Sequence, residues 1–282
     1  MRHRALCQVA LLLAAATATP GHAQEAATQA QPTAEAAPAD EAQELAKKLS
    51  NPVASLISVP FQGNWDVGSG VTGDGSKFTL NIQPVVPISI STNANIIVRT
   101  ILPVIAQANI RGDHDTDFGL GDVVQSFFYS PKKPTAGGII WGVGPVFLYP
   151  TGTSEYTTGK KWGAGPTIVV LKQFGQTTVG FLGNHIWSVA GDDRPAVSST
   201  FLQPFLAYTT KGATTYSLNT ESTYDWKTKQ WSVPINATIA QLVRIGKQPV
   251  SIGFGGRYYV ATPALGPHWG VRVVTTLLYP KK

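Results

Sequence analysis

Three aspartates alternate along one short stretch of the chain, where Asp113, Asp115 and Asp117 surround His114. Alternate residues of an extended chain point to the same side, so these carboxylates offer oxygen ligands to a hard cation such as Ca²⁺. The calcium loop of an EF-hand is excluded, because Phe118 occupies the position of its glycine. A solvated acidic loop and divalent bridging to lipopolysaccharide are the competing interpretations, and the pattern favours the solvated loop.

A second group of ionisable residues lies in segments where apolar and polar residues alternate. Its members are Arg99, Asp122, Glu221, Arg244, Arg257 and Arg272. The polar faces of such segments also carry the amides of Asn81, Gln83 and Asn236. In a membrane-spanning barrel, a charge that faces lipid costs about 2–4 kcal/mol near the midplane. We therefore expect both the charged and the amide side chains to face the lumen and to set its polarity.

Pairing among these charges leaves two interpretations open. The arginines best placed for pairing are Arg99, Arg257 and Arg272, and the acids open to them are Asp122 and Glu221. The pairs form either salt bridges that stabilise the interior or a ring that selects solutes. The excess of arginine favours anions or carboxylates as solutes.

Enzymatic chemistry has little support in the sequence. The chain contains no HExxH motif, no GxSxG motif and no glycine-rich phosphate loop. Its one cysteine, Cys7, lies in the first apolar run and has no partner for a disulfide or a metal site. A lipid hydrolase would have to use His185 with Ser188, or His268, but their spacing defines no motif. We predict no enzymatic activity and no cofactor.

The charge balance points away from nucleic acid. The formal net charge is +6, but the lysines form separate pairs rather than a basic stripe. These pairs lie at 132–133, 160–161 and 281–282. We interpret them as turn residues and as contacts to lipid headgroups.

The composition of the 282 residues favours a β protein that faces lipid. Only 13% of the residues are charged, against about 25% in a typical soluble domain. No apolar run reaches the roughly 20 residues of a membrane-spanning helix. The same composition excludes a coiled coil, a disordered chain and a small disulfide-stapled domain.

The N-terminal part divides into three segments. Residues 1–23 have the features of a secretory signal peptide, namely Arg2 and Arg4, an apolar stretch and a small-x-small site ending at Ala23. A short buried helix is the alternative for this segment. Residues 24–44 are rich in Ala, Gln, Glu, Pro and Thr, which predicts a disordered, flexible tether.

Residues 45–59 predict a short amphipathic helix. Asn51 suits an N-cap and Pro52 the first helical position. Three roles are open for this segment: it lies at the membrane interface, plugs a lumen or leads into the first strand. The sequence does not distinguish among them.

From Pro60 onward, long extended runs alternate with turn residues. The twelve runs are 60–69, 77–90, 94–106, 117–130, 137–150, 161–173, 177–190, 197–210, 213–226, 230–244, 249–261 and 268–279. Most are longer than the usual 5–6 residues of soluble strands, and they match the roughly 9–11 residues of a tilted transmembrane strand with slack at the rims. An even number suits a closed antiparallel barrel with both termini on one side.

The side-chain pattern of the runs agrees with this barrel. In 231–245, Trp231, Ile235 and Ile239 share one face while Asn236 and Arg244 share the other. Aromatic residues gather near the run ends, as they do in the girdles at the two membrane interfaces. Core aromatics of a soluble protein are the alternative. The girdle candidates are Trp65, Tyr129, Trp141, Tyr149, Trp162, Trp187, Tyr208, Trp226, Trp231, Trp269 and Tyr279.

Seven prolines interrupt these runs and remove hydrogen bonds from the sheet. They are Pro84, Pro87, Pro103, Pro145, Pro166, Pro204 and Pro234. We expect several bulges, or strands that are broken in two.

Two segments repeat with a spacing of 21 residues, Trp141-Gly-Val-Gly-Pro145 and Trp162-Gly-Ala-Gly-Pro166. With the following Pro-Thr-Gly152 and the later Gly183-Asn-His-Ile-Trp187, this series resembles the outer-membrane transporter family named for the meta-pathway of phenol degradation. The resemblance covers the chain from about Leu49 onward. It implies a closed outer-membrane barrel that acts as a channel for small, often hydrophobic or aromatic, compounds. Unlike many such barrels, the chain ends in Leu-Tyr-Pro-Lys-Lys, so Tyr279 has to serve as the assembly signal from an internal position.

The sequence thus predicts an all-β protein of the bacterial outer membrane. It consists of a closed antiparallel transmembrane barrel of about 12 strands over 60–282, preceded by a short helix and a flexible tether. The predicted function is passive uptake of small hydrophobic or aromatic molecules. The alternative is a non-conducting barrel that modifies lipids or supports the envelope. Expected partners are outer-membrane lipids and lipopolysaccharide, small solutes and the barrel-assembly machinery.

Overall fold

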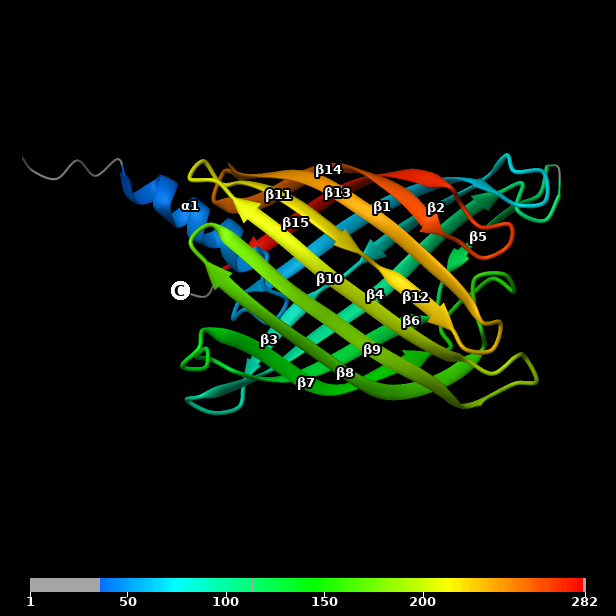
Figure 1. Ribbon diagram of the computed structural model, residues 1–282, viewed down its shortest axis with the longest axis horizontal. Helices are drawn as coiled ribbons and strands as arrows, with labels where there is room; N and C mark the ends of the chain where they lie inside the picture. Colours follow the sequence, from blue (N-terminus) through cyan, green and yellow to red (C-terminus); the bar gives the residue numbers. More distant parts are fainter. Residues whose placement is uncertain (1–35, 113, 281–282) are drawn as a thin grey trace, which may run out of the picture. The chain divides into compact units, whose positions relative to one another are not determined.

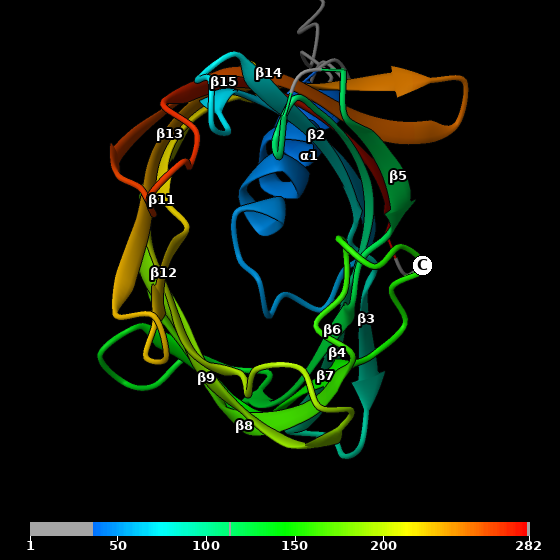
Figure 2. The ribbon, with the colours of Figure 1, turned by 90° about the vertical axis from the view of Figure 1, so that its right-hand side faces the viewer.

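The computed structural model describes residues 36–112 and 114–280. The predicted signal peptide, the tether up to residue 35, and Asp113 lie outside the described residues. Within them, one helix precedes a single antiparallel sheet that closes on itself, as Figure 1 shows from the side and Figure 2 from one end. The first and last strands, β1 (Ile57–Ser69) and β15 (Trp269–Tyr279), pair from Ile57↔Tyr279 to Val67↔Trp269 and close the barrel.

The barrel has twelve spans in the described chain, as predicted. Nine are single strands: β1, β15, β4 (Ala94–Ala108), β7 (Ile139–Tyr149), β8 (Lys161–Phe174), β9 (Thr177–Gly191), β10 (Ser198–Thr209), β13 (Gln230–Ile245) and β14 (Gln248–Ala261). The other three spans are each broken into two strands: β2 (Gly75–Ile82) with β3 (Val85–Ser89), β5 (Thr116–Leu120) with β6 (Val123–Pro131), and β11 (Thr214–Thr220) with β12 (Ser222–Asp225).

Prolines explain where the three spans break. Pro84 lies in the gap between β2 and β3, and the gap between β5 and β6 lies opposite Pro103 of β4. Glu221 separates β11 from β12, and the register skips Pro204 on β10 at this point. Because proline has no backbone N–H, the neighbouring strand loses a ladder hydrogen bond at each place. The predicted breaks are confirmed.

Two more prolines face each other within unbroken strands, where Pro145 of β7 pairs with Pro166 of β8. The β6–β7 ladder skips from Ser126↔Val146 to Tyr129↔Val143 beside Pro145, and the β8–β9 ladder skips in the same way beside Pro166. The missing N–H of Pro145 therefore coincides with a gap in the ladder to β6, and that of Pro166 with a gap in the ladder to β9.

The glycine before each of these prolines allows the backbones to approach closely. A Cβ on Gly144 would lie 1.9 Å from the carbonyl oxygen of Phe127, and one on Gly165 would lie 1.7 Å from that of His185. The repeated Trp-Gly-x-Gly-Pro segment is therefore a structural unit. Its proline opens the ladder, and its glycine lets the neighbouring strand pack against the opening.

The barrel has a turn end and a loop end. The short connections of the turn end are 90–93, 132–138, 175–176, 210–213 and 246–247. The connections of the loop end are 70–74, 109–115, 150–160, 192–197, 226–229 and 262–268. Outer-membrane barrels have short turns at one end and longer loops at the other, and the two ends of this barrel differ in the same way.

The outer face of the barrel is apolar, as the alternation predicts. Ile239 on β13 and Phe254 on β14 are exposed, while Asn236 and Ser251 on the opposite faces of these strands are buried. Exposed tryptophans near the loop end form an aromatic belt. They are Trp65, Trp162, Trp187, Trp226, Trp231 and Trp269. Within the described residues, no helix is long and apolar enough to span a membrane.

The helix lies earlier in the chain than predicted. α1 spans Ala36–Leu49, so the prediction of a flexible tether up to residue 44 was wrong for 36–44, and the helix predicted over 45–59 was wrong in its bounds. Ala, Glu, Gln and Lys are strong helix formers, which explains the early start. Pro52 disfavours the helical conformation in the residue before it, so α1 ends ahead of Asn51. Asn51 accepts a hydrogen bond from the backbone of Val53 in the turn that follows.

Candidate functional site

The segment Leu45–Leu56, here called the plug segment, lies in the lumen (Figure 2), and α1 enters at the turn end (Figure 1). Leu45 and Leu56 are buried in one apolar cluster with barrel residues that include Leu242 and Leu278. Val53 belongs to a second cluster. Its other buried members are Ile97, Phe128, Val169, Leu171 and Leu182. Of the three roles that the sequence left open for 45–59, the buried contacts of Val53 and Leu56 agree with a position inside the lumen.

Polar contacts also join this region to the barrel. Gln173 donates to the carbonyl of Lys47 at 3.0 Å, and Asn95 donates to Ser55 at 2.7 Å. Outside the plug segment, Glu41 of α1 pairs with Arg244 at 2.8 Å, and both side chains are largely exposed. Burial of each apolar side chain contributes about 1.5–3 kcal/mol, whereas an exposed ion pair contributes roughly 0–1 kcal/mol. The apolar contacts therefore dominate in holding the plug segment.

A polar layer crosses the lumen above the plug segment. Arg272 of β15 is 3% exposed and donates to both oxygens of Glu221, at 2.6 and 3.0 Å. Its Nε donates to Asn64 of β1 at 2.7 Å. Glu221 lies in the break between β11 and β12. Its backbone is not paired there, because the ladder to β10 is interrupted at Pro204.

A second charged group lies on the loop side of this layer. Arg257 of β14 pairs with Asp66 of β1 at 3.4 Å and donates to the hydroxyl of Tyr259 at 3.0 Å. Both charged side chains are about nine-tenths buried. Within the described chain, the Nε of Arg257 and the Oδ1 of Asp66 have no hydrogen-bond partner. This group is thus less fully satisfied than Arg272 and Glu221.

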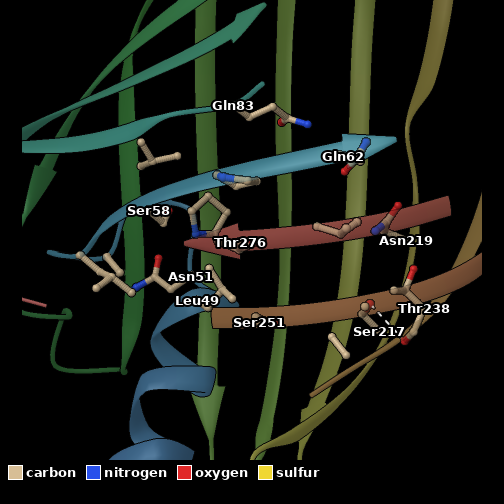
Figure 3. A pocket seen from close by; sticks show the side chains of 18 of the residues that line it. Leu49, Asn51, Ser58, Gln62, Gln83, Ser217, Asn219, Thr238, Ser251 and Thr276 are labelled. Carbon is tan, nitrogen blue, oxygen red and sulfur yellow. Dashed lines mark hydrogen bonds between the residues drawn. The ribbon is translucent and has the colours of Figure 1, made fainter. Parts of the chain in front are cut away.

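Three cavities follow one another along the lumen. The central cavity, of about 280 Å³, lies between the plug segment and the polar layer and is lined by both Leu56 and Arg272 (Figure 3). A cavity of about 320 Å³ on the loop side is lined by Glu221 and Arg257. A third, of about 250 Å³, runs beside Ala46 toward the turn end and shares several lining residues with the central cavity.

The central cavity has a polar wall drawn from many strands. Figure 3 shows Gln62, Gln83, Asn219 and Thr276 around it, with Leu49 at the side of the helix. The charged residues of its lining are Lys48, Arg99 and Arg272. No aspartate or glutamate of the described chain lines this cavity.

The predicted lumen residues are divided between two cavities and other positions. Arg99, Gln83 and Arg272 line the central cavity, where Arg99 donates to Gln83 at 2.8 Å. The loop-side cavity is lined by Glu221 and Arg257, and also by Asn81. The structure brings Arg272 and Glu221 together as expected of the charge pairs.

Three of the predicted lumen residues have other roles. Asp122 does not pair with arginine in the described chain, because its carboxylate accepts hydrogen bonds from Gly152, Thr158 and Gly159 and anchors the 150–160 loop. Arg244 lies at the turn end, where it pairs with the helix. Asn236 has no exposed surface, because it is packed in the wall and donates to Asn219 at 2.8 Å.

The aspartates of the predicted cation site have separate partners. Asp115 pairs with Arg111, and this hydrogen bond raises the pKa of the exposed Arg111 guanidinium. Asp117 accepts a hydrogen bond from Ser154 at 2.6 Å. Asp113 lies outside the described residues. Among the residues described, no group of three or more metal-ligating side chains is assembled.

The residues considered for a lipid hydrolase do not come together. His185 and Ser188 are separated by three positions on β9 and therefore point to opposite faces of the sheet. His185 lies on the outer face and contacts Thr200 at 2.7 Å, while Ser188 accepts a hydrogen bond from the backbone of Val197. The ring of His268 packs over Gly68 in a loop-end connection.

Sequence reasoning missed Asn64, Asp66, Lys77 and Tyr259, all of which line the loop-side cavity. A signal was present for Asn64 and Asp66, because they alternate with Trp65 and Val67 in the first run. Tyr259 lies two positions after Arg257 and shares its face by the same rule.

Comparison with solved structures reveals which fold this chain shares. It is similar to an outer-membrane channel from Pseudomonas putida F1, with 14% identity, coverage of 79% of this chain and 94% of that chain, and a TM-score of 0.62. Outer membrane phospholipase A from Escherichia coli matches with 12% identity, coverage of 85% and 98%, and a TM-score of 0.46. OmpT from Vibrio cholerae matches with 7% identity, coverage of 79% and 98%, and a TM-score of 0.35. The sequence matches no protein-family model and no curated protein.

The comparison establishes the fold, and the apolar outer face with its aromatic belt places that fold in a membrane. The protein is a closed 12-stranded antiparallel barrel of the bacterial outer membrane. The resemblance to the family named for the phenol meta-pathway stays a prediction.

Proposed function

We propose that this barrel is a channel through which small molecules diffuse across the outer membrane. The observation that carries the proposal is the succession of three cavities, of about 320, 280 and 250 Å³, along one lumen. The polar layer of Arg272 and Glu221 lies between the first two cavities, and the plug segment lines the second and the third. Both are held by non-covalent contacts alone.

The lining supports small solutes with both apolar and polar parts. In the central cavity, Leu56, Val85 and Leu182 lie among serine, threonine and amide side chains. An aromatic ring with one polar substituent finds partners for both parts in such a wall. The hydrophobic or aromatic cargo implied by the family resemblance is compatible with this lining.

Conductance in planar bilayers tests the channel. The full-length protein is compared with a form that lacks residues 24–56, and folding of both is checked by heat-modifiable gel mobility. We expect small discrete conductance steps that grow when the plug segment is removed. The absence of conductance from both folded forms would overturn the proposal.

A point variant separates the plug from the tether. Leu56→Ala removes buried contact with the barrel and should raise the conductance of the full-length chain, because Leu56 is 4% exposed in the turn-end cluster. Leu218→Ala is the matched control, since Leu218 lies on the outer face, is 49% exposed and lines none of the three cavities. Equal effects of the two variants would show that the plug segment does not limit the flow.

The alternative is a non-conducting barrel that modifies lipids or only supports the envelope. The hydroxyl of Ser198 lies beside His185, with 3.5 Å between Oγ and Nε2. Hydrolysis of phospholipid esters by the full-length protein, lost in His185→Ala, would support this alternative. We expect no turnover that depends on His185.

A further inference from the structure

We infer that the central cavity is a binding site for a small organic monocarboxylate, whose carboxylate is held by Arg99. The inference deepens the proposed function, because it names the class of solute that rests in the lumen. A ligand smaller than a drug molecule is required, since the cavity of about 280 Å³ lies just below the roughly 300–1,000 Å³ of pockets that hold drug-sized ligands.

The charge balance of the cavity supports an anion. Its lining contains three cations, Lys48, Arg99 and Arg272, and no acidic residue of the described chain. Glu221 neutralises Arg272 through the bidentate pair on the far side of the polar layer. Arg99 and Lys48 form no ion pair within 4.0 Å in the described structure, and Glu221 acts on Arg99 only from a greater distance. The cavity therefore has an excess of positive charge that favours an anion.

Arg99 has unused capacity for a carboxylate. A guanidinium has five N–H donors, and the described structure gives this one a single protein acceptor, the Oε1 of Gln83 at 2.8 Å. Arginine binds carboxylates in a bidentate, charge-assisted manner that an ammonium group does not reproduce. The backbone N–H of Gln83 donates to the carbonyl of Pro60, and the side chain is 7% exposed, so Gln83 is held in place beside Arg99.

The rest of the lining suits the organic part of such a ligand. Leu56 of the plug segment, Val85 of β3 and Leu182 of β9 bring apolar surface into the same cavity as Arg99. Ser58 and Thr276, which Figure 3 places on neighbouring strands of the wall, offer hydroxyl donors. A charged end and an apolar body are thus both accommodated.

Binding of benzoate to the full-length protein in detergent micelles tests the inference by titration calorimetry. Benzamide is the matched neutral probe, because it has the same ring and size but no charge. We expect benzoate to bind at least tenfold more tightly than benzamide, and Arg99→Gln to weaken benzoate binding at least tenfold without changing that of benzamide. Equal binding of the two probes, or unchanged benzoate binding in the folded Arg99→Gln, would overturn the inference.

Two further variants guard against misinterpretation. Lys247→Gln removes one positive charge from an exposed turn outside the cavity and should leave benzoate binding unchanged. If Arg99→Gln does not fold, Arg99→Lys is the substitute, because it keeps the charge but loses the bidentate geometry of the guanidinium. It should lower the benzoate affinity while preserving the preference for benzoate over benzamide. A lysine variant with no loss of benzoate affinity would contradict the role of the guanidinium.

The binding measurement is independent of the channel. Benzoate bound by Arg99 in a barrel without conductance supports the carboxylate site and contradicts the channel. Conductance without a preference for benzoate in binding, and with a reversal potential unchanged by Arg99→Gln, supports the channel and contradicts the site.

Discussion

Arg272 and Glu221 meet through two hydrogen bonds of 2.6 and 3.0 Å although their strands are not neighbours in the sheet. Two other spans, β13 and β14, lie between β12 and β15 on the path around the wall. The pair therefore crosses the lumen instead of running along the wall. Because it is bidentate and largely buried, it links distant parts of the barrel and narrows the path between two cavities.

Removal of one partner of this pair should destabilise the barrel strongly. Arg272→Ala leaves Glu221 buried without its counter-charge, which typically costs about 3–5 kcal/mol. The free energy of unfolding in detergent, measured by denaturant titration, checks this value. Arg244→Ala is the control, since Arg244 forms an exposed ion pair with Glu41 that should contribute no more than about 1 kcal/mol.

The double variant Arg272→Met with Glu221→Leu is expected to recover most of that stability. Replacement of a buried ion pair by apolar side chains is often neutral or stabilising. If the double variant is as unstable as Arg272→Ala, the cost lies in packing around the layer rather than in an unpaired charge.

Val53→Asp should release the plug segment while the barrel stays folded. Val53 is 5% exposed and packs against the second apolar cluster, so a carboxylate there loses the burial of the side chain and has to be solvated. We expect larger single-channel conductance with unchanged heat-modifiable mobility. Val71→Asp, in an exposed loop-end position, should change neither quantity.

The glycines of the repeated Trp-Gly-x-Gly-Pro segment should not tolerate a side chain. In Gly165→Ala, the new Cβ meets the backbone carbonyl of His185 at 1.7 Å, and overpacking of this kind costs about 1–3 kcal/mol or more. Gly256→Ala on β14 is the matched control, because nothing lies within 4 Å of its Cβ. A comparison of their unfolding midpoints decides the point, and equal midpoints would contradict the close approach at the proline gap.

Asp122→Ala should loosen the 150–160 loop at the mouth of the barrel. It removes the acceptor for the backbone N–H groups of Gly152 and Gly159, at 3.0 and 2.7 Å, and hydrogen bonds to charged groups contribute about 1.5–3 kcal/mol each. Hydrogen exchange of these two amides should accelerate at least tenfold. Asp193→Ala, in another loop of the same end, should leave their exchange rates as they are.

Much of the fold could be predicted from the sequence because its signals are local. In the run from Trp231 to Ile245, each residue's face follows from its position in an alternation of period two, and the structure confirms the outward Ile239 and the inward Asn236. Pro84 marked a broken span for an equally local reason, the missing N–H. The helix begins earlier than the tether-like composition predicts, because its alanines and glutamates have a high helix propensity.

The candidate site could be predicted only in part, because its members meet through closure of the barrel. Asn64 and Arg272 are 208 positions apart and are bonded because the first and last strands pair. The sequence pattern predicts that Asp122 and Glu221 both face the lumen. In the structure, Asp122 anchors the 150–160 loop, whereas Glu221 pairs with Arg272. By itself the sequence determined the twelve spans, the lipid-facing side and the apolar residues available for a plug. Only the tertiary structure decided which charges share the lumen and that Leu45–Leu56 fills its turn end, since those contacts depend on the register and curvature of the whole sheet.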